Sequence, residues 1–234
     1  IKNLSKIIKL RKLSTSVGDE GGFAPMISNN NQALDLIVSA IKKSGFVNGK
    51  DVSICLDVAA NELLKKNKYS IHSKSYLSVE KSITEYKKII KKYNIKSIED
   101  PFAENDWIAW NKLMKSIKKV QIVGDDLYVT NLETVKKGFL NLSSNAILIK
   151  LNQIGTVSET LDVIRFAQII GFKTIISHRS GDSEDTFIAD LAVGTNSNQI
   201  KTGSLARSER VAKYNQLIRI EEQLGKKARM NKIH

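Results

Sequence analysis

Six short apolar runs in this chain each end at a residue that can do acid–base or metal chemistry. The first three end on carboxylates, because Asp57 closes SICLD, Glu99 closes KSIE and Asp125 closes QIVGD. Carboxylates at neighbouring strand ends repel one another unless a cation neutralises them. Hard oxygen ligands of this kind suit Mg²⁺, which keeps waters that substrate oxygens can replace. The three acids together predict a magnesium site, although each one alone could instead cap the next helix.

The fourth apolar run ends on a lysine, since Lys150 closes AILIK. A lysine at a buried strand end is costly unless it is paired or functional. Beside metal-bound carboxylates, Lys150 could be held near neutrality and serve as a general base. The alternative is a lysine that only balances the charge of the acids.

The last two runs end on groups that bind anions. TIISHRSGD places His178, Arg179 and Ser180 after one strand, and QIKTGS ends the next with Lys201. An arginine with a neighbouring hydroxyl grips phosphate or carboxylate oxygens, whereas a histidine here is more often structural. Two lysines and an arginine opposite a metal site predict a substrate that carries both phosphate and carboxylate.

A glycine-rich segment near the amino end, VGDEGGFAP, contains Glu20. Gly21 and Gly22 could form an ordinary tight turn. A carboxyl group held in such a turn near a metal site is also a candidate general acid.

The elements that must position these groups alternate between strand-like and helical patterns. Helical stripes lie between the strand-like runs, as in Leu34, Ile37, Val38 and Ile41, and Gly45 follows this stripe as a C-terminal stop signal. Such βα alternation predicts a parallel sheet, and functional groups after six successive strands favour a (β/α)8-type TIM barrel over an open sheet. We expect one α/β domain over residues 1–234. The predicted strands are Val52–Asp57, Ile95–Glu99, Gln121–Asp125, Ala146–Lys150, Lys173–His178 and Gln199–Lys201.

The composition limits the classes of function. The chain has 234 residues, is 41% hydrophobic and carries a formal charge of +13. Cys55 is its one cysteine, so no disulfide framework is possible and a reducing cytosolic setting is expected. There is no apolar run near the roughly 20 residues that span a bilayer. The lysines fall in doublets on predicted helix faces, which favours a solvated surface over a nucleic-acid site.

The motifs resemble those of enolase, phosphopyruvate hydratase. They are VGDEGGFAP, SIEDPF, IVGDD, ILIKLNQIG, SHRSG, IKTG and the closing RSERVAKYNQLIRIEEQLG, in order from about Lys2 to Lys227. The resemblance implies dehydration of 2-phosphoglycerate to phosphoenolpyruvate, with two Mg²⁺ ions stabilising an ene-diolate intermediate. It also implies a cytoplasmic homodimer, with a cell-surface location known for the family, and no association with membranes.

The resemblance assigns roles to the residues already singled out. Lys150 would take the C2 proton and Glu20 would protonate the departing C3 hydroxyl. Asp57, Glu99 and Asp125 would hold the Mg²⁺ that binds the substrate carboxylate.

It assigns substrate binding to four others. Arg179 and Ser180 would bind the phosphate, Lys201 would support the carboxylate and His178 would line the pocket.

Enolases carry an amino-terminal domain and two barrel strands upstream of the matched region. We therefore expect this chain to be the C-terminal barrel portion, incomplete at its N-terminal side and inactive or nearly so alone. Around Asp57, the motif LDVAANEL carries Val58 and Asn61 where the family usually has Cys and Ser. Two alternatives remain, a non-enzymatic protein that binds polyanions or a cell surface, and a related enzyme acting on a non-phosphorylated acid.

Overall fold

The computed structural model describes residues 1–72, 75–197 and 199–230, and these form two compact units. The first unit comprises residues 1–16, 24–128 and 136–145, and the second comprises residues 17–23, 129–135 and 146–234. Among the described residues, no helix combines the length and the apolar character that crossing a membrane requires.

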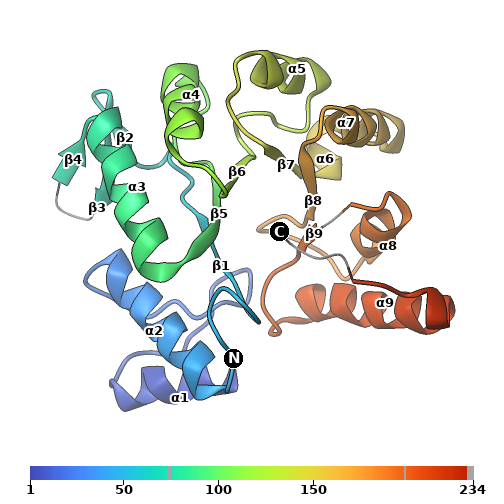
Figure 1. The fold of residues 1–234 in the computed structure, drawn as a ribbon. Helices are drawn as coiled ribbons and strands as arrows, with labels where there is room; N and C mark the ends of the chain where they lie inside the picture. The colour runs from blue at the N-terminus through green and yellow to red at the C-terminus, as the bar shows by residue number, and fades with distance from the viewer. Residues whose placement is uncertain (73–74, 198, 231–234) are drawn as a thin grey trace. The chain divides into compact units, whose positions relative to one another are not determined.

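The first unit contains three parallel strands. β1 (Ile54–Asp57) pairs with β5 (Ile95–Glu99), and β5 pairs with β6 (Gln121–Gly124), with Asp57 opposite Glu99 and Glu99 opposite Val123. Helices α3 (Val79–Tyr93) and α4 (Trp107–Ser116) connect them, as a parallel sheet requires. Helices α1 (Lys2–Leu10) and α2 (Asn30–Lys43) lie side by side in this unit (Figure 1).

A small antiparallel sheet is inserted between β1 and α3, and the sequence patterns did not predict it. It consists of β2 (Leu64–Lys65), β3 (Lys68–His72) and β4 (Ser75–Leu77), in that order. Tyr69 anchors it, because its ring meets Phe102 edge-on at 5.0 Å and its hydroxyl donates to Asp106 at 2.8 Å. Such aromatic pairs add about 0.5–1.5 kcal/mol beyond their area burial.

The second unit contains the other three parallel strands. β7 (Ala146–Ile149) pairs with β8 (Lys173–Ser177), and β8 pairs with β9 (Gln199–Lys201), so that Ser177 lies opposite Lys201. Figure 1 shows α8 (Phe187–Gly194) beside α9 (Ser208–Leu224) in this unit. Its further helical elements are α6 (Leu151–Ile154), α7 (Val157–Ile169) and the 3-10 turn η1 (Gly225–Lys227). The boundary between the units falls within α5 (Leu132–Leu140).

The predicted strands and helices are confirmed, with ends that differ by a few residues. The strand ending at Asp57 begins at Ile54, and Asp125, Lys150 and His178 directly follow their strands. Ser78 caps α3, because its hydroxyl accepts from the amide of Lys81. The basic amino end forms α1.

The buried faces of two helices differ in part from their hydrophobic stripes. In α2, Leu34 of the predicted stripe is buried together with Leu36 and Ala40, whereas Ile37, Val38 and Ile41 are half-buried. In α9 the sequence stripe of Val211, Tyr214, Ile218 and Glu221 is half-buried or exposed. The face that is turned inward instead carries two cations, Arg210 and Lys213, together with Ile220. Hydrophobic periodicity cannot find a face whose buried side chains are charged.

Candidate active site

The predicted metal ligands all lie in the first unit, at the ends of its parallel strands. Asp57 and Glu99 are register partners on β1 and β5, with Asp57 exposed and Glu99 buried. Asp125 is buried and directly follows β6. Carboxylate oxygens presented by three adjacent strands are a donor set that fits Mg²⁺.

The structure groups Asp125 with two acids that the sequence prediction did not include. Ligand atoms of Asp100, Asp125 and Asp126 all lie within 4.8 Å of one another. The carboxylate of Asp100 accepts from the amides of Asp125 at 2.9 Å and Asp126 at 2.8 Å. Burial is the largest cause that raises the pKa of Asp100 to about 7; the two amides oppose this rise, and the neighbouring carboxylates of Asp125 and Asp126 contribute to it. Asp100 therefore shapes the turn after β6.

Asn61, one of the departures from the usual family pattern, links the loops around these acids. Its side-chain amide donates to Asp126 at 2.8 Å, and its carbonyl oxygen accepts from the amide of Glu104 at 3.0 Å. The loops after β1, β5 and β6 are thus joined through one side chain.

The predicted catalytic and substrate-binding residues all lie in the second unit. Lys150 follows β7 and is half-buried, and its backbone amide donates to the hydroxyl of Thr130 at 2.9 Å. That hydroxyl donates in turn to Gln153 at 2.9 Å. Thr130 is fully buried with φ +53°, a strained conformation for a β-branched residue that costs roughly 1–3 kcal/mol. Thr130 was not predicted as a site residue.

The structure brings Glu20 and His178 together. The glycine turn is closed by two hydrogen bonds, from the amide of Gly18 to the carbonyl of Gly22 and from the amide of Gly21 to the carbonyl of Gly18. The backbone carbonyl of Glu20 accepts from the amide of Ser204 at 2.8 Å. The Glu20 carboxylate then lies 3.3 Å from Nε2 of His178, whose side chain is 2% exposed.

The electrostatic surroundings of His178 keep its ring neutral. Burial lowers the pKa of His178 most, Glu20 opposes this, and the positive charges of Arg210 and Lys201 lower the pKa further. The amide of His178 also donates to the carbonyl of Lys201 at 3.0 Å, which ties the ends of β8 and β9.

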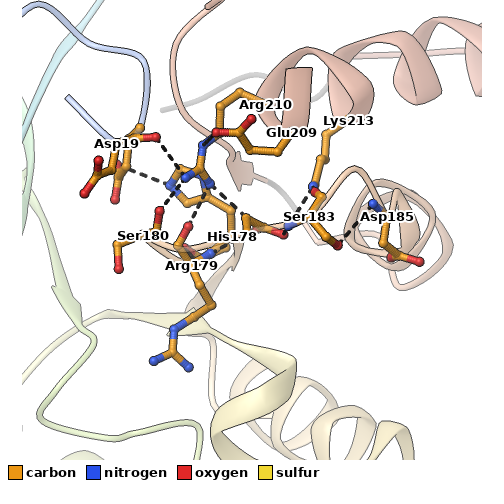
Figure 2. A network of polar contacts seen from close by, with 12 residues as sticks. Asp19, His178, Arg179, Ser180, Ser183, Asp185, Glu209, Arg210 and Lys213 are labelled. Atoms are coloured by element: carbon orange, nitrogen blue, oxygen red, sulfur yellow. Dashed lines mark hydrogen bonds and ion pairs between the residues drawn. The ribbon is translucent and has the colours of Figure 1, made fainter. Parts of the chain in front are cut away.

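The side chain of Arg179 and the backbone carbonyls of Arg179 and Ser180 point in different directions. Figure 2 shows the guanidinium of Arg179 extending away from the network around Arg210, and it donates to Asn152 at 2.7 Å. The backbone carbonyls of Arg179 and Ser180 point back and accept from Arg210. The Arg179 side chain is thus held at the loop surface, while exposed Ser180 follows it.

Two buried cations of α9 support this loop, and sequence reasoning missed both. Lys213 is 1% exposed and donates to Asp182 at 3.3 Å and to the carbonyl of Ser183 (Figure 2). Partial burial opposes ionisation of Asp182, but the amides of Arg179 and Ser183 and the Lys213 ammonium hold its pKa below the usual range. The available signal was the spacing of Arg210 and Lys213, three residues apart on one helix face.

Parallel strands followed by helices, with ionisable groups after the strand ends, are typical of TIM-barrel domains. The comparisons with known proteins agree. The chain belongs to the enolase C-terminal TIM barrel domain family, whose model matches residues 1–234. It is 82% identical over 234 residues to the enolase of Pelagibacter ubique (strain HTCC1062). The predicted fold class and family are confirmed, and the chain spans 56% of that relative's length.

Proposed function

We propose that this chain supplies the catalytic barrel portion of a magnesium-dependent lyase that dehydrates 2-phosphoglycerate to phosphoenolpyruvate. The observation that supports this most is the contact between Glu20 and His178 at 3.3 Å in a chain 82% identical to an enolase. A carboxyl in a glycine turn is held there against a buried histidine. This is a suitable arrangement for a general acid whose position is fixed.

In the proposed reaction, Lys150 removes the proton at C2 and the electron pair of that bond enters the substrate carboxylate. Collapse of this intermediate forms the C2–C3 double bond and breaks the C3–O bond. Glu20 gives its proton to the departing hydroxyl, which leaves as water. The backbone bond to Thr130 supports this role because it fixes the chain at the base.

Substrate binding would use the remaining strand-end groups of the second unit. The exposed end of Arg179, with Ser180 beside it, suits the phosphate, and Lys201 suits the carboxylate. His178 would contact Glu20 and line the pocket.

Asp57, Glu99 and Asp125 would hold one Mg²⁺ ion, and a second Mg²⁺ ion is expected. When bound, the two ions would supply positive charge that makes a dianionic intermediate accessible. A cytoplasmic homodimer is the corresponding proposal for location and assembly.

The test measures formation of phosphoenolpyruvate by its ultraviolet absorbance, in the presence and absence of Mg²⁺. The 234-residue chain is assayed alone and joined to the remaining amino-terminal part of the Pelagibacter enolase. We expect little or no turnover by the chain alone, since it spans 56% of that relative. The joined protein should turn over, and Lys150→Ala or Glu20→Gln should lower kcat at least 100-fold.

The matched control is Lys173→Ala, an exposed lysine at the start of β8, away from its carboxyl end. A folded joined protein without turnover contradicts the lyase proposal. So does a Lys150→Ala variant that keeps wild-type activity.

A second function, binding of polyanions, is favoured by the charge of +13. Lys6, Lys9 and Lys43 line a hollow with Leu10 on the surface of α1 and α2. Binding of single-stranded RNA that weakens steeply between 50 and 200 mM salt would support this alternative.

A further inference from the structure

Arg210 is a fully buried cation at the start of α9, and its partners come from two other loops. Its guanidinium contacts Nδ1 of His178 at 2.8 Å and donates to the carbonyls of Arg179 at 2.7 Å and Ser180 at 2.6 Å. It also donates to the carbonyl of Asp19 at 3.1 Å, in the glycine turn. Figure 2 shows these groups converging on one side chain.

The contact with His178 fixes the proton of its ring. An arginine guanidinium has only N–H donors and stays protonated in proteins. Nδ1 of His178 must therefore accept, so it carries no proton. A neutral ring with a bare Nδ1 carries its proton on Nε2, and this nitrogen lies 3.3 Å from the Glu20 carboxylate.

Nε2 of His178 is otherwise buried without a well-formed hydrogen bond. The Glu20 carboxylate, 3.3 Å away, is the acceptor that lies within reach of this N–H. The charged groups that act on the ring are Glu20, Arg210, Lys201 and Asp182.

Arg210 also joins the turn that carries Glu20 to the loop after β8. Gly203 explains how closely the side chain passes, because a Cβ there would lie 2.8 Å from Cδ of Arg210 and 2.8 Å from the carbonyl oxygen of Glu20. The same guanidinium therefore holds the backbone of the Glu20 turn in place. Through His178 it also determines which ring nitrogen carries the proton beside the Glu20 carboxylate.

We propose that Arg210 is a positioning residue for Glu20: it holds His178 as the Nε2–H tautomer and fastens the Glu20 turn to the loop after β8. The N–H of His178 stabilises the carboxylate that remains after Glu20 has given up its proton. This catalytic meaning rests on the proposed lyase function. The tautomer of His178 and the attachment of the Glu20 turn to the loop after β8 do not depend on the lyase function. Both can be measured without substrate.

The experiment records long-range ¹H–¹⁵N correlations of the histidine rings in the 234-residue chain, which has three histidines. His178→Gln assigns the signal. We expect Nε2 protonated and Nδ1 bare between pH 7 and 8. Arg210→Met should give a mixture of tautomers and a ring that titrates at higher pH. Arg219→Met, at an exposed arginine on the same helix, should leave both unchanged.

A second variant covers the case in which Arg210→Met does not fold. Arg210→Lys keeps the positive charge but loses the planar guanidinium with its several N–H donors. In this variant His178 should no longer keep a single tautomer, and amide exchange at residues 18–22 should be faster. A wild-type ring that is Nδ1–H or doubly protonated at pH 8 overturns the proposal. So does an Arg210 variant that keeps the wild-type tautomer and the wild-type exchange rates. Either result can occur while the lyase proposal stands, because no turnover is measured.

Discussion

The backbone amide of Lys150 donates to the hydroxyl of Thr130 at 2.9 Å, so one buried threonine fixes the residue predicted to be the base. Thr130 keeps a strained left-handed backbone to do so. Thr130 has no part in the proposed reaction, but its hydroxyl fixes the backbone at the carboxyl end of β7.

Replacing Thr130 with valine should lower the free energy of unfolding by about 1–3 kcal/mol, because the partly buried Lys150 amide loses its hydroxyl acceptor while the shape of the side chain at position 130 is kept. Urea unfolding measures this. Thr84→Val is the matched control, since Thr84 is exposed on α3 and its hydroxyl donates to the carbonyl of Glu80 in the same helix. Equal midpoints for the two variants would contradict the role assigned to Thr130.

The two adjacent glycines of the Glu20 turn should differ sharply in their response to alanine. Gly21 has φ +77° and an added Cβ would lie 2.6 Å from the carbonyl oxygen of Ala206, whereas a Cβ on Gly22 meets nothing within 4 Å. Gly21→Ala should cost at least about 1 kcal/mol of unfolding free energy and speed amide exchange at residues 18–22. Gly22→Ala should change neither. Similar behaviour of the two variants would argue against the geometry of this turn.

The lowered pKa of His178 makes stability depend on pH in a defined direction. The unfolded histidine titrates near 6.5, so below about pH 6.5 the unfolded chain binds more protons than the folded one. This part of the stability is fully present above pH 6.5 and declines as the pH falls, by at most about 1.4 kcal/mol per pH unit. It levels off below the pKa of the folded state. Urea unfolding between pH 5 and 8 should show a weaker slope in His178→Gln, and identical slopes would refute the prediction.

Added Mg²⁺ should raise the thermal midpoint of the chain if the acids of the first unit bind it. At a Mg²⁺ concentration 100 times the dissociation constant, binding stabilises the folded state by about 2.7 kcal/mol. Glu99→Gln should remove the shift because Glu99 is buried at the predicted site. Glu80→Gln, at an exposed acid paired with Lys112, should retain it. A shift that survives in Glu99→Gln would place the ion elsewhere.

The positions of the parallel strands along the chain, and the ionisable residues at their ends, could be predicted from the sequence. Apolar runs and strand-end acids such as Glu99 are local signals. The sequence was insufficient for Arg210 and Lys213, because buried cations look like surface residues until their partners are known. The β2–β4 insertion was missed for a related reason. Its strands are short and lysine-rich, and Lys66 and Asn67 turn with positive φ where no glycine marks the turn.

The bond between Arg210 and the carbonyl of Asp19 joins residues 191 positions apart. Synthesis proceeds from the amino end, so the Glu20 turn leaves the ribosome long before its fastening does. The turn cannot close over its final partners until α9 has been made and has docked, which is a slow, non-local step. During that interval the proposed general acid remains loosely held, and the site is completed only by a helix that is translated much later than the Glu20 turn.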